Sequence, residues 1–573
     1  MKGTYNASSK RSLHKPLWQV ICLLTVVVLL AACVQTPAPQ QPAAPAQAAP
    51  AQGAASKVKL PQDAAPEQVL HVATGSSGSA SFTFTPMQGG GDQQNWQTLV
   101  WMPPMYFDTE FKDLKPGIFI SWKPNDDFTQ WTFAIDPAAK WSDGSPITAS
   151  DVKGTWEVMA DPLTQHGRIV GYIGKVKGFA AVHEQKGTDI EGLKVVDEKT
   201  LQVTLDTPDP LFHYRIATTH MNPVKAEQAR KDRDNFWKPE NKPAVSGPYM
   251  LESYNADAGE ATMVPNPNWW KDEGPYLSKI TFQFVPDAET VATMIQNKQV
   301  DATIASVPPT LKANFPDLFR PIKAIGFNTF WLIPSVEPTD DLNVRKALIL
   351  SVNFEDVLKA AFPEGGATLA KQLIDPDNPC VDTEKTWYKF DPAAAKEALK
   401  ASKYGSADKL PKLRVTPRGD WPPMNRALEA VMEMWRQNLG ITNIEFKVKP
   451  DEFGEDEKKL NLLRDDVVTR FPDAATYLWT GTSSKGPISA EIMRGYNNPK
   501  VDALLTEALS TPVENPKRCQ LAVEAQRLFM DDYMVIFFGI PESYISARDY
   551  VANYNKGPDV SLIEPWKIYL KAH

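Results

Sequence analysis

Residues 140–152 read Lys-Trp-Ser-Asp-Gly-Ser-Pro-Ile-Thr-Ala-Ser-Asp-Val, and they predict a tight turn followed closely by a helix. Asp143 and Gly144 suit the turn, because Asp caps its own loop and glycine tolerates positive φ. Thr148 and Asp151 have the spacing of a capping box, in which each side chain accepts a hydrogen bond from the other residue's backbone N–H. A helix is therefore expected to begin directly after Thr148.

Strand signals flank this stretch on both sides. Apolar residues alternate there with polar or small ones, which is the period-two pattern of a half-buried strand: Trp131, Phe133 and Ile135 before the stretch, and Leu201, Val203 and Leu205 after it. Residues 197–199, Asp-Glu-Lys, form a turn-like break before the second set. We expect one strand before the helix and another after it.

Farther along the chain, strand and helix signals stay mixed. Residues 280–284 alternate, Asp287 can cap a helix, and residues 300–304 form a second short apolar run. This strand, helix, strand order is typical of a parallel crossover. Two more helices are expected where proline follows asparagine, at 498–499 and at 515–516, because proline is favoured at the first helical position. The sequence therefore predicts an α/β body.

Residues 140–152 also belong to a longer series of segments with a recognisable order. The others are 114–117 (LKPG), 122–127 (WKPNDD), 246–249 (SGPY), 266–270 (NPNWW), 341–348 (DLNVRKAL) and 495–502 (GYNNPKVD). Each segment alone is weak evidence, but the series covers roughly residues 68–573. In this series the chain resembles family 5 of the bacterial extracellular solute-binding proteins, the oligopeptide-, dipeptide- and nickel-binding components of ABC importers.

The resemblance implies a two-lobed α/β clamp like the periplasmic binding proteins (type II, cluster C-like), with a hinge and an extra inserted domain. By analogy, we expect a discontinuous first lobe at 67–106, 212–322 and 541–573, an inserted domain at 107–211, and a second lobe at 323–540. The quoted motifs are expected to be mainly structural. Gly247-Pro248 suits a bend between strands, and Arg345 on its helix is expected to brace packing.

The resemblance also implies a function: a solute, most simply a peptide, is captured between the lobes and delivered to the permease and ATPase subunits of an importer. In peptide binders of this family an Asp holds the α-ammonium of the ligand, and Asp473 is the nearest counterpart here. If Asp473 has that role, Asp473→Asn should weaken peptide binding more than tenfold. Aromatic side chains are expected to supply apolar walls: Phe82, Phe84, Phe471, Tyr477 and Trp479.

Two segments depart from the family pattern where the resemblance places the ligand cleft. Residues 82–86 read FTFTP in place of a family "tLDP", and residues 87–92 are rich in glycine. Residues 467–473, VVTRFPD, replace the family's ligand-facing segment. These departures, with the 16 tryptophans of the chain, keep a sugar or another small molecule open as the ligand.

The N-terminus carries an export signal. A basic segment, residues 10–15, precedes the apolar residues 17–30, which are too few to span a ~30 Å hydrocarbon core comfortably. Residues 30–33, Leu-Ala-Ala-Cys, look like a bacterial lipobox, which implies a signal peptide at 1–32 and acyl chains on Cys33. An ordinary signal peptide cut elsewhere is the alternative.

Residues 33–66 are expected to form a disordered tether, because Pro, Ala and Gln dominate them and almost nothing could build a core. The net charge of -8 argues against nucleic acid as a partner, since phosphate binding needs clustered Lys and Arg. No apolar run after residue 33 could cross a bilayer, so we expect a monomeric body outside the cytoplasm, in the periplasm or at the cell surface, held to the membrane by lipid.

The chemistry-bearing residues predict neither a metal site nor a cofactor. The seven histidines are scattered without ligand spacing, and no nucleophile elbow or phosphate loop is present, so we expect no enzymatic activity. A surface hydrolase and an adhesion lipoprotein are the alternatives from other classes. Cys380 and Cys519 remain in the exported body, and the sequence leaves open whether they form a disulfide or stay separate buried thiols.

Overall fold

The computed structural model describes most of the chain that follows residue 58. The described residues are 59–74, 82–88, 95–304, 318–322, 326–374, 378, 380–382, 385, 387–419, 421–468, 472–486, 488–489, 492–557 and 561–573. The predicted signal peptide, Cys33 and all but the last residues of the predicted tether lie outside them, as does Phe471.

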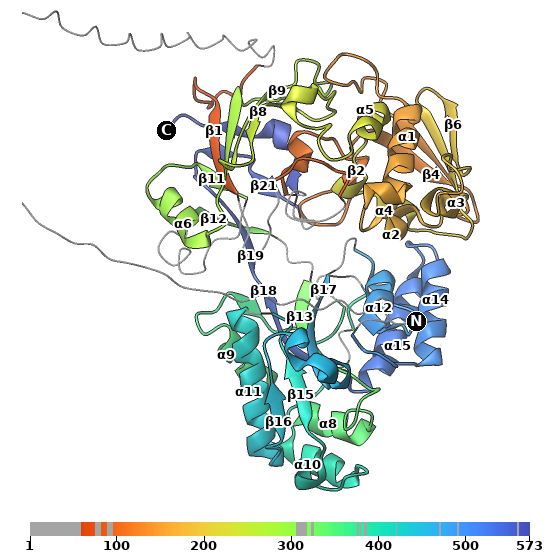
Figure 1. Cartoon of the computed structure of the whole chain (residues 1–573), viewed down its shortest axis with the longest axis vertical. Helices are drawn as coiled ribbons and strands as arrows, with labels where there is room; N and C mark the ends of the chain where they lie inside the picture. The colour runs from red at the N-terminus through yellow and green to blue at the C-terminus, as the bar shows by residue number, and fades with distance from the viewer. Residues whose placement is uncertain are drawn as a thin grey trace, which may run out of the picture. The chain divides into compact units, whose positions relative to one another are not determined.

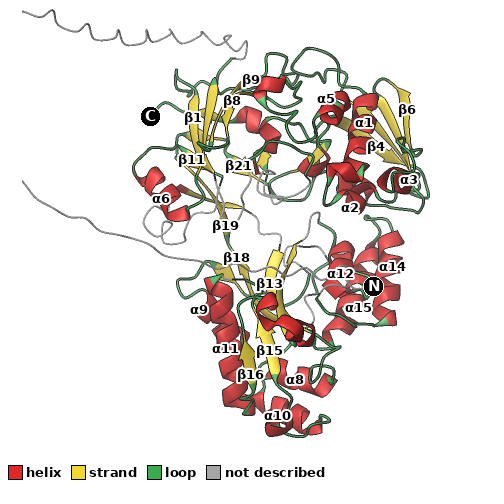
Figure 2. Cartoon of the chain, in the orientation of Figure 1, coloured by secondary structure: helices red, strands yellow, loops and turns green. Residues whose placement is uncertain are grey.

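A seven-stranded mixed sheet collects strands from distant parts of the chain (Figures 1 and 2). Its order is β12-β19-β11-β1-β10-β9-β8, with bounds Phe319–Ile322, Ser543–Ala547, Ala302–Thr303, Val69–Thr74, Lys279–Phe284, Glu260–Pro265 and Tyr249–Asn255. Strand β1 runs parallel to both β10 and β11, and helix α6 (Ala288–Gln296) connects these two strands. The predicted parallel crossover is confirmed, with Asp287 as the N-cap of α6.

A smaller antiparallel sheet carries the motif at 140–152. Its order is β4-β5-β7-β6, with bounds Phe119–Pro124, Gln130–Ile135, Thr200–Thr204 and Leu193–Asp197. Helix α1 (Ala149–Ala160) begins after Thr148 in a complete capping box with Asp151, as predicted. One continuous hydrophobic core joins this sheet to the seven-stranded sheet.

A six-stranded sheet forms the centre of the part that follows residue 325. Its order is β14-β18-β13-β17-β15-β16, with bounds Ala367–Thr368, Val535–Pro541, Gly326–Leu332, Leu462–Val468, Leu413–Thr416 and Ile444–Phe446. Successive residues of β13 face opposite sides: Trp331 packs into one core, while Phe330 and Leu332 pack into another. Helices therefore cover both faces of this sheet.

The helices divide between the two faces by sequence order. On the Phe330 side lie α8 (Leu342–Leu350), α9 (Phe354–Ala361), α10 (Pro392–Ala401) and α11 (Pro422–Leu439). On the Trp331 side lie α12 (Ala474–Thr482), α14 (Pro499–Ser510) and α15 (Pro516–Met530). Asn498 and Asn515 cap α14 and α15, and proline occupies the first position of each, as the sequence predicts.

The described chain also contains short helices and strands. The helices are α2 (Ile169–Ile173), α3 (Phe179–His183), α4 (Phe212–Ile216) and α5 (Ala226–Lys231). The strands are β2 (Met105–Phe107), β3 (Leu114–Pro116), β20 (Val551–Ala552), β21 (Asn555–Lys556), β22 (Leu562–Ile563) and β23 (Tyr569–Leu570). Across the described residues, we find no helix with the length and hydropathy needed to traverse a bilayer.

The chain passes twice between the large sheets. Strand β12 precedes β13 on one passage, and β18 precedes β19 on the other. Strands β12 and β19 are antiparallel neighbours in the seven-stranded sheet, and β13 and β18 are antiparallel neighbours in the six-stranded sheet. The two passages therefore connect neighbouring strands of one sheet to neighbouring strands of the other.

Two of the quoted motifs have the structural roles expected of them. A Cβ on Gly247 would lie 2.4 Å from the carbonyl carbon of Val100, so no larger residue fits this bend. Arg345 donates from Nε to the Asp532 carbonyl (2.9 Å) and from Nη1 to the Thr339 carbonyl (2.9 Å). Its guanidinium thus fastens helix α8 to two loops.

Candidate functional site

Two segments follow the carboxyl ends of parallel strands, one in each large sheet. Residues 82–88 come after β1, which is parallel to β10, and residues 472–473 come after β17, which is parallel to β15. In open α/β sheets, ligands bind outside the carboxyl ends of the strands. These two segments are therefore the candidate walls of a ligand site.

The first wall is held in place by its own carbonyl groups. Four consecutive carbonyls accept hydrogen bonds from side chains: Phe82 from the Tyr254 hydroxyl, Thr83 from Trp96 Nε1 (2.9 Å), Phe84 from Trp101 Nε1 (2.7 Å) and Thr85 from Gln97 Nε2 (2.6 Å). Side-chain indole, phenol and amide groups thus make the hydrogen bonds to these carbonyls that a neighbouring strand would make. They hold the segment in place although it belongs to neither sheet.

The backbone N–H groups of the same segment are used differently. Thr85 N–H donates to Thr83 Oγ1 (3.3 Å), but no acceptor in the described part of the chain meets the N–H of Phe82, Thr83 or Phe84. A buried N–H without a partner is rare in folded proteins, so such groups invite an acceptor from a ligand or from water. The carbonyls of residues 82–85 are thus occupied, while the N–H groups of residues 82–84 meet no acceptor among the described residues.

The aromatic rings of this wall pack inward, in contrast to the role predicted for them. Phe84 is fully buried and Phe82 is 6% exposed. The Phe82 ring stacks on Phe284 at 5.4 Å and lies 5.6 Å from Tyr254. The two rings therefore belong to the core, and what this segment can offer a ligand is its backbone.

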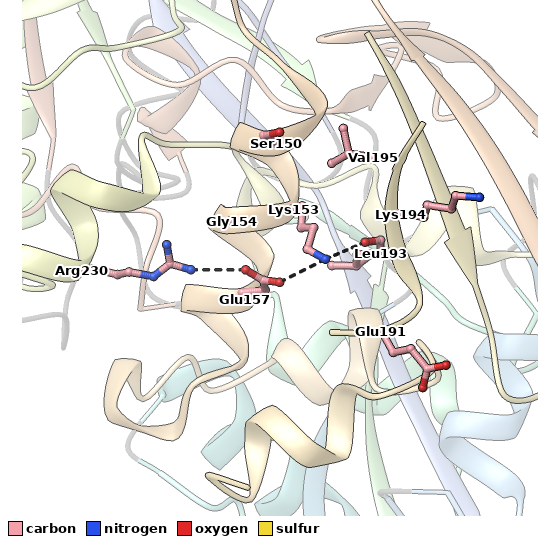
Figure 3. A pocket seen from close by; sticks show the side chains of 9 residues that line it. All are labelled: Ser150, Lys153, Gly154, Glu157, Glu191, Leu193, Lys194, Val195 and Arg230. Carbon is pink, nitrogen blue, oxygen red and sulfur yellow. Dashed lines mark hydrogen bonds and ion pairs between the residues drawn. The ribbon is translucent and has the colours of Figure 1, made fainter. Parts of the chain in front are cut away.

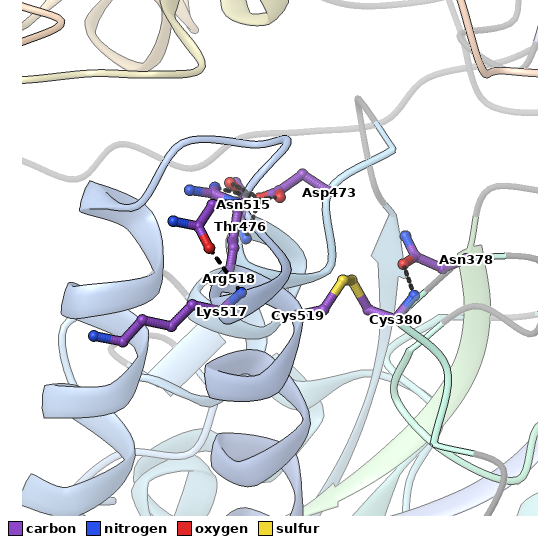
Figure 4. The surroundings of a disulfide bond; sticks show 8 residues. All are labelled: Asn378, Cys380, Asp473, Thr476, Asn515, Lys517, Arg518 and Cys519. Carbon is purple, nitrogen blue, oxygen red and sulfur yellow. Dashed lines mark hydrogen bonds and ion pairs between the residues drawn. A yellow bond between two sulfur atoms is a disulfide. The ribbon is translucent and has the colours of Figure 1, made fainter. Parts of the chain in front are cut away.

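Asp473, the predicted partner of a ligand ammonium, is already paired in the second wall (Figure 4). Arg518 Nε donates to one carboxylate oxygen (2.7 Å) and Nη2 donates to the other (2.8 Å). The second oxygen also accepts from the N–H and the Oγ1 of Thr476, both at 2.8 Å, which makes Asp473 the N-cap of α12. The carboxylate is 6% exposed, so the structure gives it a structural role.

The remaining predicted wall residues follow Asp473 on α12. Tyr477 is 7% exposed and belongs to the core beside the six-stranded sheet, and Trp479 is half-buried against the same core. Helix α12 thus turns its aromatic residues toward the protein. Phe471 lies outside the described residues. Periodicity could not separate core aromatics from ligand-facing ones, because both fit the same amphipathic pattern.

Sequence reasoning missed a polar group on the central strand β17. Arg464 Nη2 donates to Asn328 Oδ1 on the adjacent strand β13 (2.9 Å), and the guanidinium lies 6.0 Å from the ring of Trp421. Trp421 is 38% exposed, which is unusual for an indole. The available signal was Arg464 itself, a half-buried cation in the central strand β17 (LLRDDVV), where a charge needs a partner or a ligand.

Cys380 and Cys519 form a disulfide, with their Cα atoms 5.0 Å apart (Figure 4). Cys519 lies in the first turn of α15, next to Arg518. The bond therefore ties the segment around residue 380 to the helix whose arginine holds Asp473. Of the two possibilities that the sequence left open, the structure contains the paired one.

A pocket of about 560 Å³ lies between α1, β6 and α5 (Figure 3). Three of its charged groups are paired with one another: Lys153 Nζ contacts Glu157 (3.6 Å) and donates to the Leu193 carbonyl (2.9 Å), and Arg230 Nη2 contacts Glu157 (3.3 Å). Burial is the largest influence on the Glu157 carboxyl and raises its pKa despite these cations. None of the predicted ligand residues lines this pocket.

Buried histidines lie near the smaller sheet, but they do not form a metal centre. Burial lowers the pKa of His220 to about 3 and that of His213 to about 4. His220 Nδ1 lies 2.7 Å from the Tyr172 hydroxyl. No group of three or more His, Cys, Asp or Glu side chains that could hold a metal ion occurs among the residues the structure describes.

Solved structures of similar fold include two peptide-binding proteins. The unliganded open form of the periplasmic murein tripeptide-binding protein MppA matches with a TM-score of 0.73 and 21% identity, over 89% of this chain and 98% of that one. The Haemophilus influenzae OppA complex with the peptide RPPGFSPFR matches with a TM-score of 0.68 and 21% identity, over 89% and 100%. The predicted fold class, a two-lobed α/β clamp, is confirmed.

Peptide-binding proteins are also among the relatives that are similar to this chain in sequence. The oligopeptide-binding protein OppA of Bacillus subtilis (strain 168) is 27% identical over 428 residues, 71% of this chain and 75% of its own. The periplasmic oligopeptide-binding protein OppA of Salmonella typhimurium is 24% identical over 472 residues, 79% and 80%. The model for the middle part of the bacterial extracellular solute-binding proteins, family 5, matches residues 113–488. The chain therefore belongs to family 5 of the bacterial extracellular solute-binding proteins.

Proposed function

We propose that this protein captures a peptide between its two lobes by hinge closure and delivers it to the permease of an ABC importer. Members of its family are solute-binding proteins and not enzymes. The capture role asks for two walls that can approach each other and for backbone or side-chain groups that recognise a peptide without reading its sequence. The described residues supply candidates for both the walls and the recognition groups.

The observation that carries the proposal is the arrangement of the two walls. One follows β1 in the seven-stranded sheet and the other follows β17 in the six-stranded sheet, while paired neighbouring strands connect the sheets. A connection through two adjacent passages permits rotation of one lobe against the other, as in hinge closure. A ligand that contacts both walls only in the closed form shifts the population toward that form.

The recognition groups suit a peptide backbone. The N–H groups of residues 82–84 meet no acceptor among the residues that the structure describes, and they can donate to ligand carbonyls, as an added strand does. In the six-stranded sheet, Arg464 on β17 and Asn328 on β13 form a polar group beside the exposed Trp421, which suits a carboxylate and an apolar side chain. The named relatives include oligopeptide-binding proteins, and one solved relative holds a nonapeptide.

The N-terminus supports a lipid-anchored location. We propose that acyl chains on Cys33 hold the protein to the cell membrane, that residues 33–66 act as the tether, and that the body works as a monomer outside the cytoplasm. Cys33→Ser should release the protein into the soluble fraction, and Cys380→Ser should not. Mass spectrometry of the native N-terminus checks the lipid directly.

The decisive experiment identifies what the protein carries. The full chain is purified without denaturation, and the bound solute is extracted and identified by mass spectrometry. Peptides in the extract support the proposal, whereas a sugar or a metal chelate as the bound solute contradicts it. Incubation with synthetic peptides, followed by chromatography, should recover them intact, since a hydrolase would accumulate products.

A further inference from the structure

Helices α14 and α15 are joined by a turn, residues 511–515, whose apolar residue packs outside its own lobe. The core that joins the seven-stranded sheet to the smaller antiparallel sheet consists of buried residues from 65 to 304 and from 545 to 570. Among the described residues that form or line this core, Val513 alone comes from the part of the chain between 326 and 540, which surrounds the six-stranded sheet. Val513 therefore connects the two lobes in addition to the two passages of the chain.

Tyr214 on α4 is the residue of the receiving lobe that feels this turn. It is half-buried against the same core as Val513, and its ring lies 5.4 Å from the ring of Phe107, measured between centroids. Burial raises the pKa of the Tyr214 hydroxyl, and the carboxylates of Glu514 and Asp473 raise it further. Two acidic residues of the six-stranded lobe thus lie within electrostatic reach of α4.

Phe107 belongs to an aromatic group that a hairpin holds in place. Strands β2 and β3 pair, and Phe111 in the loop between them is 3% exposed, with its ring centroid 4.8 Å from that of Phe107. The Phe111 N–H donates to the Asp108 carbonyl (3.1 Å), and the Lys112 N–H donates to Asp108 Oδ1 (2.9 Å). The loop is therefore fixed by its own hydrogen bonds. We call Phe107, Phe111 and Tyr214 the aromatic seat.

The turn is fixed to its own lobe through Arg518. Nη1 of Arg518 donates to the carbonyls of Ala508 and Thr511, at the end of α14. Nε and Nη2 donate to Asp473, which caps α12 (Figure 4). Because one guanidinium ties the turn to three helices, Val513 moves only together with the six-stranded lobe.

The position of the contact indicates the form of the clamp to which it belongs. Asp473 follows the carboxyl end of β17, and open α/β sheets bind ligands outside that end of their strands. Residues of the two lobes that meet at this end separate when a hinge motion opens the cleft, and they meet again when the cleft closes. An apolar contact that exists only in the closed form stabilises that form relative to the open one.

We propose that Val513 is a positioning residue for capture: it docks on the aromatic seat when the lobes close and shifts the equilibrium toward the closed form. This inference rests on the proposed capture function and adds to it a contact that touches no ligand. Because apparent affinity scales with the fraction of the chain in the binding-competent form, losing the contact weakens binding without changing the ligand site.

Calorimetry with the full chain tests this role. Native mass spectrometry first selects a ligand from a pool of tri-, tetra- and pentapeptides built from Gly, Ala, Leu and Phe. Val513→Asp places a charge in the apolar contact, so this variant should bind the selected peptide about fivefold or more weakly than the unmodified chain. Val513→Ile should stay within about twofold, and so should Leu342→Asp, which changes an exposed residue (45%) of the same lobe. An unchanged or higher affinity of Val513→Asp overturns the inference.

Two further variants complete the test. Tyr214→Ala removes part of the aromatic seat, and in a double-mutant cycle the combined loss with Val513→Asp should be smaller than the product of the single losses, because both changes break one contact. Losses that multiply would give the two residues separate roles and overturn the inference. Where circular dichroism shows that Val513→Asp has not folded, Val513→Ala takes its place, with an expected loss of about twofold or more. If the unmodified chain binds no peptide of the pool, the capture function itself fails, and the inference falls with it.

Discussion

At the scale of single residues, Asp473 has two roles: it caps helix α12, and it neutralises the buried charge of Arg518. Asp473 caps α12, and Arg518 comes from α15, 45 positions later in the chain. Each side chain makes the burial of the other tolerable, because an unpaired buried charge costs several kcal/mol. The pair therefore fixes where the chain leaves the second wall and enters α12.

We predict that Asp473→Asn lowers the free energy of unfolding by about 3–5 kcal/mol, because asparagine can still cap α12 but leaves Arg518 without its counter-charge. Urea unfolding measures the loss. Asp287→Asn is the matched control: Asp287 caps α6 through the N–H and Oγ1 of Thr290, is exposed, and has no ion-pair partner in the described chain. A loss as small as in this control would contradict the assigned role of the pair.

The buried histidines predict acid sensitivity. Folding lowers the pKa of His220 to about 3 and that of His213 to about 4, through burial in each case. Below pH 6.5 the unfolded chain binds protons that the folded chain refuses, so stability is complete above that pH and declines as pH falls. Each histidine should contribute about 1.4 kcal/mol per pH unit between pH 6 and its folded pKa.

Urea unfolding at a series of pH values tests this slope. His213→Phe is the matched variant, because the His213 ring stacks on Trp131 at 4.6 Å and its Nδ1 meets no partner in the described chain. Phenylalanine keeps the stacked ring and removes the titration, so the variant should lose less stability between pH 6.5 and 4.5 than the unmodified chain. Equal losses would contradict the linkage.

At the scale of elements, local signals predicted helix starts well. The Thr148 capping box, the Asp287 cap and the two asparagine-proline starts each depend on residues within four positions, so the sequence contains the whole interaction. The site was less accessible to prediction. The partner of Asp473 is distant in sequence, and no pattern near Asp473 indicates that it is occupied.

Contacts between residues distant in sequence also explain why the role of the first wall, residues 82–88, could not be predicted. Phe82 and Phe84 are aromatic residues in a segment outside regular structure, where neither helix nor strand periodicity assigns a face. Their burial depends on Tyr254 and Phe284, which the fold brings from the seven-stranded sheet. The donor character of the segment likewise depends on side chains elsewhere, so it becomes visible only in three dimensions.

Gly247 supports a prediction about the bend between residue 246 and strand β8. A Cβ there would lie within 2.6 Å of both the carbon and the oxygen of the Val100 carbonyl, which are backbone atoms and cannot move aside alone. Gly247→Ala should therefore lower the free energy of unfolding by about 3 kcal/mol through overpacking. Calorimetry or urea unfolding measures the change.

Gly171→Ala is the control for that substitution. Gly171 lies in helix α2, and nothing stands within 4 Å of its ideal Cβ position. Alanine should stabilise this helix by roughly 0.5–1 kcal/mol because it is the better helix former. If the free energy of unfolding falls in Gly247→Ala and rises in Gly171→Ala, the close approach of the Val100 backbone is the reason for glycine at 247. Similar changes in the two variants would reject this explanation.

At the scale of the whole molecule, the anchoring of the passages between the sheets determines what can move. Arg320 on β12 donates from Nη2 to the carbonyls of Arg548 (2.9 Å) and Val551 (2.6 Å), which follow β19. Strands β13 and β18 are paired in the centre of the six-stranded sheet. The strands at both ends of each passage are thus anchored, and the proposed closure would change the angle between the two sheets.

This arrangement predicts a ligand-dependent closure of the full chain. Peptides at a concentration one hundred times their Kd should stabilise the protein by about 2.7 kcal/mol, because they bind the folded state alone. Small-angle X-ray scattering should show a smaller radius of gyration with peptide bound. The same peptides hydrolysed to amino acids serve as the control, since they cannot contact both walls at once. If peptide raised the stability while the scattering profile stayed unchanged, the solute would be held on one lobe, and delivery to the importer could not depend on closure.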